Sequence, residues 1–259
     1  MTKTPEETPP AFLFGASIGA MKRRFMLAGS LAVLSAPVHA DEPAVDLALV
    51  LAVDVSRSID EEEAELQRRG YIEAMTDSRV ITAILSGEHK RIAICYVEWA
   101  GTHYQMPVID WTLIDSAAAA RAFASKLGEA PHVSQSWTAV GAALAFSGER
   151  LDRSGFAAKR RVIDISGDGR TNDGPPAEIV RDKLVAQGIV INGLPVMLNH
   201  RNFNRPPDAT LDKYYEENVI GGPGSFMIPA VNFEDFGRAV RSKLIREISG
   251  LPVSLPTPA

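Results

Sequence analysis

The sequence predicts an α/β fold built on a largely parallel sheet. From residue 45 to residue 248, apolar stretches of strand length alternate with amphipathic stretches of helical length, which is the pattern of successive βα units. The first strand, expected at residues 45–54, contains the unbroken apolar run LALVLAV, as a strand covered by helices on both faces should. No repeat, long linker or low-complexity tract divides the region. One domain is therefore predicted over residues 41–250.

Each element has a local signal of its own. Apolar residues at helical spacing predict a helix over residues 61–85, with Gly87 after its end. A strand is expected at 91–99, and a strand at 105–113 is expected to run antiparallel at the sheet edge. Proline in the first turn favours a helix at 176–187. The remaining expected elements are helices at 116–127, 139–151 and 233–248, strands at 161–166, 189–196 and 225–231, a further element at 211–219, and an extended Pro-rich tail at 251–259.

The first forty residues are predicted to be an N-terminal extension and a signal peptide. Residues 22–24 of the segment MKRR are basic, residues 25–34 form an apolar segment, and the small residue Ala40 suits a cleavage site. Cleavage there would leave Asp41 first and place the protein in a bacterial periplasm or outside the cell, with Met21 as an alternative start. A membrane anchor is disfavoured because the apolar segment is about half of the ~20 residues that a span needs. The arginine pair leaves twin-arginine export as an alternative to the general secretory route.

Composition excludes some classes of partner and chemistry. The net charge is -5, and acidic and basic residues are interspersed, so there is no basic surface for nucleic acid. Cys95 is the single cysteine, which rules out an intrachain disulfide. It lies in an expected strand, where a small buried hydrophobic residue is the natural interpretation.

Hydroxyl and carboxylate side chains follow or precede three of the expected elements. Asp54, Ser56 and Ser58 come directly after the first strand, and Asp168 comes after the strand at 161–166. Thr138 stands just before the helix at 139–151. In open α/β sheets the loops beyond the carboxyl ends of the strands converge. We therefore expect two carboxylates and three hydroxyls to meet at one edge of the sheet.

This set of oxygen atoms favours a small, hard divalent cation. Mg²⁺ binds oxygen ligands in an octahedral array and is held by one or two carboxylates with hydroxyls and water, and Mn²⁺ or Ca²⁺ are the alternatives. Thiolates and imidazoles are missing from these segments, which disfavours zinc and copper. With so few charged ligands, the cation would keep positive character and accept a carboxylate from another molecule.

Three short segments resemble the metal-ion-dependent adhesion site (MIDAS) of von Willebrand factor A (vWA) domains. They are DVSRS at 54–58, SWTAVG at 136–141 and SGDG at 166–169, and the resemblance extends over residues 45–249. It implies a Rossmann-like three-layer sandwich, with helices on both faces of a mostly parallel sheet of about six strands and one antiparallel edge strand. The resemblance is greatest to a group of secreted proteobacterial vWA-like proteins of unknown function.

The same resemblance assigns roles to the candidate ligands. It implies that Ser56 and Ser58 bind the metal directly and that Thr138 does so when a ligand is engaged. Asp54 and Asp168 would act directly or through water. Trp137 departs from the small residue that many relatives have before the threonine, and its ring would shape the rim of the site.

Each of these residues also has a purely structural interpretation. Asp54, Ser56 or Ser58 could cap the following helix, and Thr138 could cap the helix at 139–151. Asp168 could be a turn residue between two glycines. Asp173, in TNDG, is expected to be a turn residue rather than a ligand.

The function expected from these features is that of an exported, metal-dependent interaction module that captures an Asp or Glu of a protein partner. One alternative is a Mg²⁺-dependent phosphoester hydrolase, but Ser56 occupies the second acidic position of the D-x-D motif that such phosphatases use. Within the predicted domain, residues 41–250, GxSxG, P-loop and HExxH motifs are also missing. A metal-free scaffold is the other alternative. Arg201 and Arg205, in the polar segment 198–212, belong either to a solvated loop or to one that steers an acidic partner.

Overall fold

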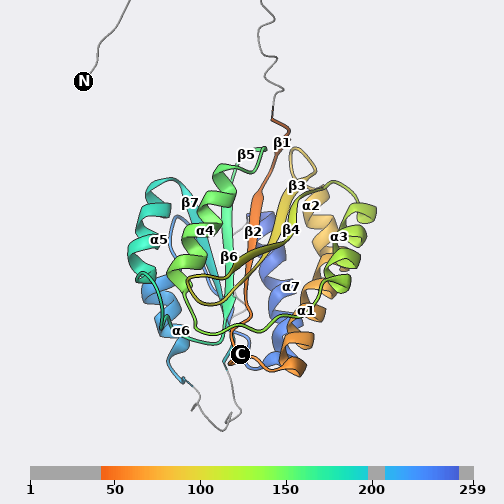
Figure 1. Ribbon diagram of the computed structural model, residues 1–259. Coiled ribbons are helices and arrows are strands. Elements are labelled where there is room, and N and C mark those ends of the chain that lie inside the picture. The colour runs from red at the N-terminus through yellow and green to blue at the C-terminus, as the bar shows by residue number, and fades with distance from the viewer. Residues whose placement is uncertain (1–41, 198–207, 251–259) are drawn as a thin grey trace, which may run out of the picture. The chain divides into compact units, whose positions relative to one another are not determined.

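A computed structural model describes residues 42–197 and 208–250 of the 259-residue chain. The predicted signal peptide, the tail at 251–259 and the two arginines Arg201 and Arg205 lie outside the described residues. Seven strands occur in the described part (Figure 1): β1 Ala44–Val45, β2 Ala48–Asp54, β3 Ile92–Trp99, β4 Gln105–Ile114, β5 Ala157–Ala158, β6 Arg161–Gly167 and β7 Ile189–Pro195.

Five of the strands form the central sheet, in the order β4-β3-β2-β6-β7. β2 pairs in parallel with β3 and β6, and β6 pairs in parallel with β7. β4 runs antiparallel to β3 at one edge, as the sequence predicts. β1 and β5 form a separate two-stranded parallel pair. Because β2 and β6 are neighbours in register up to Val53 and Ser166, the residues that follow them leave the sheet at the same edge.

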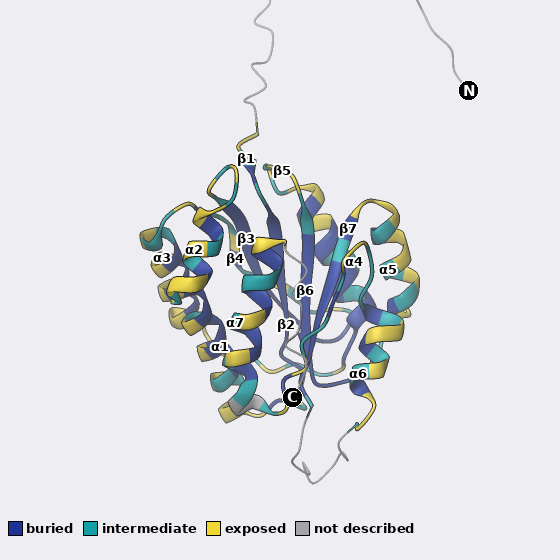
Figure 2. Ribbon diagram, turned by 180° about the vertical axis from the view of Figure 1, so that it is seen from behind, coloured by how far each residue is buried: buried dark blue, intermediate teal, exposed yellow. Residues whose placement is uncertain are grey.

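Helices cover both faces of the sheet and make it the middle of three layers (Figure 2). The helices are α1 Glu61–Thr76, α2 Ser78–Leu85, α3 Ala117–Glu129, α4 Val140–Asp152, α5 Ala177–Ala186, α6 Leu211–Tyr214, the π-helix η1 Tyr215–Val219 and α7 Phe233–Ser249. One apolar core lies between the sheet and α1, α2, α3 and α7, and a second lies between the sheet and α4, α5, α6 and η1. Among the helices of the described residues, none combines the length and hydropathy of a transmembrane span.

The helix predicted over residues 61–85 is two helices that meet at Asp77. Apolar spacing continues across the junction, so periodicity alone does not reveal the break. Asp77 ends α1, and its carboxylate accepts a hydrogen bond of 2.8 Å from the backbone N–H of Arg79 at the start of α2. Aspartate favours this capping position over a helix interior because its side chain satisfies an N–H that the helix leaves without a partner.

The strand predicted at residues 225–231 is replaced by isolated bridges beside β7, which explains why the sheet has five strands rather than about six. Met227 bridges Gly193, and Ala230 bridges Val196. Pro229 has no backbone N–H and cannot contribute a donor to a continuous ladder. Just before the segment, Gly222 and Gly224 adopt φ values of 95° and 75°, which turn the chain away from an extended path.

A buried polar cluster fixes α7 to the sheet. The Lys243 ammonium lies 2.5 Å from the Asp164 carboxylate of β6 and also pairs with Glu247 one turn further along α7. Asn192 of β7 donates a hydrogen bond of 2.9 Å to Glu247. The side chains of Lys243, Asp164 and Glu247 are fully buried. Such a cluster sets the position of the helix, since removing one partner would leave the others charged and buried.

Candidate metal site

The carboxyl ends of β2 and β6 bring three of the predicted ligands into direct contact. Ser56 Oγ and Ser58 Oγ lie 2.9 Å apart, and Ser58 Oγ donates a hydrogen bond of 2.7 Å to Asp168 Oδ1. Asp54, at the last position of β2, accepts a 2.7 Å hydrogen bond from the backbone N–H of Ser56 through Oδ1. This contact closes a tight turn that returns the two serines toward the sheet edge.

These spacings suit a hexacoordinate cation. Around an ion that binds oxygen at 2.0–2.1 Å in an octahedral array, neighbouring ligand oxygens lie about 3 Å apart. The separations of 2.9 Å between Ser56 and Ser58 and 2.7 Å between Ser58 and Asp168 are close to that value. The oxygen atoms therefore fit a small hard cation without large movements of the backbone.

Thr138 belongs to a second loop, residues 134–138, that runs beside the first loop, residues 55–60 between β2 and α1. The backbone N–H of Arg57 donates to the Gln135 carbonyl, and the N–H of Gln135 donates to the Val55 carbonyl. The Thr138 side chain is buried. Its backbone N–H donates a hydrogen bond of 2.8 Å to Asn172 Oδ1, and its carbonyl accepts one of 2.9 Å from the backbone N–H of Asn172. The loop that carries Thr138 is thus bonded to the first loop at Gln135 and to Asn172 at Thr138 itself.

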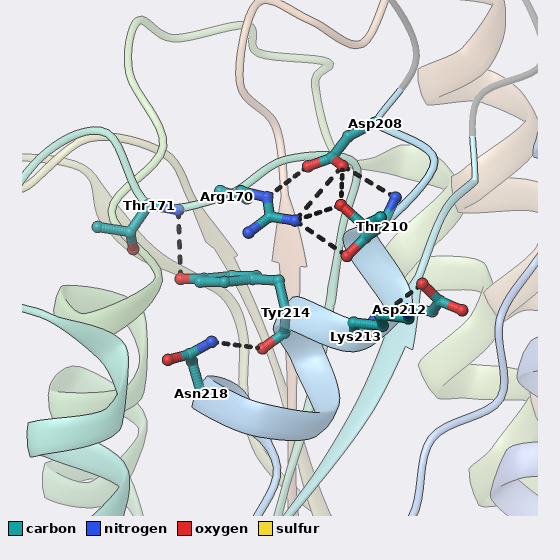
Figure 3. A network of polar contacts seen from close by, with 8 residues as sticks. All are labelled: Arg170, Thr171, Asp208, Thr210, Asp212, Lys213, Tyr214 and Asn218. Atoms are coloured by element: carbon teal, nitrogen blue, oxygen red, sulfur yellow. Dashed lines mark hydrogen bonds and ion pairs between the residues drawn. The ribbon is translucent and has the colours of Figure 1, made fainter.

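The third loop, residues 168–176, is braced against α6 (Figure 3). The Arg170 guanidinium lies 2.5 Å from Asp208 and donates a hydrogen bond of 2.7 Å to Thr210 Oγ1. The same guanidinium stacks over the Tyr214 ring, whose hydroxyl accepts a 3.3 Å hydrogen bond from the backbone N–H of Thr171. These contacts hold the loop against the segment 208–214.

Two further positions let the three loops approach closely. Asp173 accepts hydrogen bonds from the backbone N–H and the hydroxyl of Thr102, so it ties the third loop to the β3–β4 turn, in agreement with its predicted structural role. A Cβ atom at Gly141 would lie 2.2 Å from the Pro175 carbonyl oxygen. Only glycine therefore allows the start of α4 to pack against the third loop in this way.

The alternative interpretation of these residues as helix caps is wrong. The N-cap of α1 is Asp60, whose side chain and that of Glu63 form a reciprocal capping box. The N-cap residue of α4 is Ala139, which makes no side-chain cap hydrogen bond. Asp54, Ser56, Ser58 and Thr138 all lie outside these two capping positions.

The chemistry at the site is oxygen-based and negatively charged. Asp54 and Asp168 are buried, and a cation bound between them would offset the free energy needed to bury negative charge. The part of the chain that the structure describes contains no cluster of three or more His, Cys, Asp or Glu residues suited to a metal. Cys95 is buried in β3, and burial raises the pKa of its thiol to about 12.

The rim of the site carries an exposed aromatic side chain. Trp137, directly before Thr138, is 64% exposed and has a left-handed φ of 72°. The backbone on both sides is fixed, because Ser136 accepts a hydrogen bond from Gly101 and Ala139 donates one to Ala100. The ring is therefore presented to solvent from a rigid, strained position.

Tyr215 is a functional candidate that the sequence prediction missed. It is fully buried in η1, and burial followed by the negative charge of Asp54 raises its pKa well above the ordinary value. A tyrosine far along the chain in a short helix has no recognisable pattern. The TNDG segment at 171–174 next to the SGDG segment was the available signal for the supporting role of Asn172.

Solved structures of low sequence identity share the fold. The proximal thread matrix protein 1 of the mussel byssus aligns with a TM-score of 0.58 at 13% identity, over 80% of this chain and 48% of that one. The pilus adhesin SpaC of Lactobacillus rhamnosus GG aligns with a TM-score of 0.58 at 13% identity, over 80% of this chain and 31% of that one. A von Willebrand factor type A protein of Catenulispora acidiphila gives a TM-score of 0.52 at 14% identity, over 80% and 42%.

This chain therefore spans less than half the length of each of those three chains. A further structure of the mussel protein has a zinc-occupied MIDAS motif. The curated proteins contain no match to this chain.

A protein-family match covers most of the described domain. The family described as "Protein of unknown function (DUF1194)" matches residues 44–252, which include all five candidate ligands. The sheet order, the helical layers and the structural relatives are those of the vWA fold. The chain belongs to this DUF1194 family, and its fold is that of a von Willebrand factor A domain.

Proposed function

We propose that the protein is an exported interaction module that binds a divalent cation and, through it, an acidic residue of a protein partner. The contact of Ser56, Ser58 and Asp168 across two loops carries the proposal. It gathers hard oxygen atoms at spacings that suit one small cation. The predicted signal peptide supports export.

In this proposal Ser56, Ser58 and Thr138 supply hydroxyl oxygens, and Asp54 and Asp168 supply carboxylates directly or through water. The bound cation would supply a Lewis-acidic position that accepts a carboxylate from outside. Mg²⁺ fits the all-oxygen set best, with Mn²⁺ and Ca²⁺ as alternatives. Zn²⁺ belongs in the same tests because the mussel matrix protein has a zinc-occupied MIDAS motif.

A role in capture is favoured over hydrolysis. A phosphatase of the D-x-D type needs a second acid where this chain has Ser56. The Ser56 hydroxyl lies within hydrogen-bond distance of the Ser58 hydroxyl. The structural relatives include a thread matrix protein and a pilus adhesin. This similarity supports a non-enzymatic role.

The surface around the site offers contacts for the partner. Trp137 is exposed on one side of the second loop, and an exposed aromatic ring on a rigid backbone is a typical anchor at protein interfaces. Arg57, exposed between the two serines, would attract an acidic residue. A hollow of about 400 Å³ lies beside the first loop, with Arg57, Glu61, His132 and Ser134 among the residues that line it.

Calorimetric titration of the protein with Mg²⁺, Mn²⁺, Ca²⁺ and Zn²⁺ tests the metal half of the proposal. The wild type is expected to bind one divalent ion per chain. The double variant Asp54→Asn with Ser56→Ala should bind at least 100-fold more weakly, because it removes a charge and a ligand oxygen. Asp152→Asn is the matched control, since Asp152 pairs with Arg161 at the opposite end of β6, and it should bind like the wild type.

The partner half is tested by affinity capture from the exported protein fraction, with and without EDTA. Chelator and the Asp54→Asn, Ser56→Ala variant should each abolish capture. Wild type that binds no divalent ion would refute the metal site, whereas capture that is insensitive to chelator would support the metal-free scaffold instead.

A further inference from the structure

The buried hydroxyl of Tyr215 stands out beside the metal site. Tyr215 is 0% exposed, and its Oη has no hydrogen-bond partner within residues 42–197 and 208–250. In folded proteins, the large majority of buried polar side-chain atoms are hydrogen-bonded, because a buried group without a partner destabilises the fold. An unsatisfied phenol in the interior therefore calls for a role outside packing.

The Tyr215 hydroxyl lies close to the Asp54 carboxylate, at the end of β6. A Cβ atom built on Gly167 would lie 3.0 Å from Tyr215 Oη and 2.8 Å from Asp54 Oδ2. Both oxygen atoms thus face the same position over Gly167, the last residue of β6. Gly167 precedes Asp168 directly, so the phenol lies where the two acidic loops leave the sheet.

The segment that carries Tyr215 is fastened to the third loop of the site. Tyr215 begins the π-helix η1, and π-helical turns occur frequently at functional sites. Its neighbour Tyr214 accepts a hydrogen bond from Thr171 and lies under the Arg170 guanidinium (Figure 3). Movement of the third loop would therefore move the Tyr215 ring as well.

We propose that Tyr215 is a positioning residue for the cation site, whose hydroxyl donates a hydrogen bond to the Asp54 carboxylate when the ion is bound and orients that carboxylate toward the ion. This inference rests on the proposed metal function. Groups that hydrogen-bond to a ligating carboxylate fix its orientation and raise metal affinity. Asp54 Oδ1 is already engaged by the Ser56 N–H, and Oδ2 is the oxygen that faces the phenol.

The variant Tyr215→Phe tests the assignment because it removes the hydroxyl and keeps the ring. Calorimetric titration with Mg²⁺ should show an affinity about 10–100-fold lower than that of the wild type, the usual effect of losing an outer-sphere partner. The melting temperature of the metal-free variant, measured in EDTA, should be unchanged or higher, since an unsatisfied buried hydroxyl is removed. If the hydroxyl had a packing role alone, its loss would leave Mg²⁺ affinity unchanged and would lower the melting temperature in EDTA.

Tyr96→Phe is the matched control. Tyr96 is also fully buried, in the apolar core on the opposite face of the sheet, and its loss should leave Mg²⁺ affinity unchanged. Equal Mg²⁺ affinity in wild type and Tyr215→Phe would overturn this inference alone. A melting temperature that falls by several degrees without metal would also overturn it, and wild type that binds no Mg²⁺ would overturn it together with the proposed function.

Discussion

Trp137 has a left-handed backbone although it is not glycine, with φ of 72°. For an L-amino acid this conformation costs roughly 1–2 kcal/mol, because Cβ approaches the following carbonyl oxygen. The ring is mostly exposed, so little burial compensates for that strain. Strained residues persist where the surrounding structure enforces them, and they cluster at binding sites.

Two substitutions of Trp137 measure the backbone strain in the absence of the indole ring. Trp137→Gly should be more stable than Trp137→Ala by about 1 kcal/mol, because glycine adopts a positive φ without the steric penalty. Urea unfolding of both variants measures the difference. Val231 is the control position, since it is exposed and has no left-handed φ, and there the alanine variant should be the more stable of the two. The same order at both positions would contradict a strained Trp137.

Individual ligand residues could be predicted from the sequence only as a set. Aspartate and serine after a strand suit a helix cap as well as a metal, and the local sequence does not separate the two. The structure excludes the cap interpretation, because Asp60, two residues after Ser58, forms the cap of α1. The metal interpretation stays a proposal. What the sequence could not supply was the supporting side chains. Tyr215 and Arg170 are brought beside the candidate site by the fold, and no short segment of the sequence indicates this position.

The helix α7 meets the sheet through ionisable groups rather than apolar contacts alone. A single ammonium, that of Lys243, serves the two buried carboxyl groups of Asp164 and Glu247. Burial, and then the neighbouring charge of Asp164, raise the pKa of Glu247 to about 8. A net negative charge in the interior is thereby avoided, because one carboxyl keeps its proton.

The raised pKa predicts how stability changes with pH. Folded protein binds the Glu247 proton more tightly than unfolded protein does, so this group's contribution is complete below its ordinary pKa of 4.5 and is lost as pH rises toward 8. Glu247→Gln cannot lose a proton. The free energy of unfolding of Glu247→Gln minus that of the wild type should therefore rise by about 1 kcal/mol per pH unit between pH 5 and pH 8.

Urea unfolding in EDTA at four pH values measures this difference. Glu65→Gln, on an exposed position of α1, is the control and should follow the wild-type curve. Parallel pH curves for wild type and Glu247→Gln would show that the Glu247 carboxyl is ionised throughout that range.

Element boundaries differ from the sequence prediction where a polar residue or a proline interrupts an apolar pattern. The helix at 61–85 breaks at Asp77, where capping competes with helix continuation. The expected strand at 225–231 becomes two bridges because Pro229 cannot donate to a ladder. The short strand β5 has no hydrophobic run to reveal it, since it consists of Ala157 and Ala158. Elsewhere, apolar runs between clear turns predicted the elements to within a few residues.

For the molecule as a whole, the fold class followed from the alternation of elements, and convergence of the loops followed from the parallel sheet. Adjacent parallel strands β2 and β6 end together, so residues 110 positions apart in sequence, Ser58 and Asp168, share a hydrogen bond. The domain bounds of 41–250 and the choice of cation stay predictions. The first depends on processing of the leader and the second on binding of an ion, and contacts within the chain reveal neither.

A cation that binds the folded protein must also stabilise it. The three loops meet only in the fold, so the unfolded chain offers the ion no equivalent site. The free energy of unfolding should then rise with the logarithm of the free ion concentration, by about 2.7 kcal/mol at 100 times the dissociation constant.

Urea unfolding across a series of Mg²⁺ concentrations at constant ionic strength is the most direct measurement of whether these loops form a cation site. The wild type and the Asp152→Asn control should gain stability together, while the Asp54→Asn, Ser56→Ala variant should gain none. Wild-type stability that does not change with Mg²⁺, or an equal rise in the double variant, would contradict a cation site formed by Asp54, Ser56, Ser58, Thr138 and Asp168.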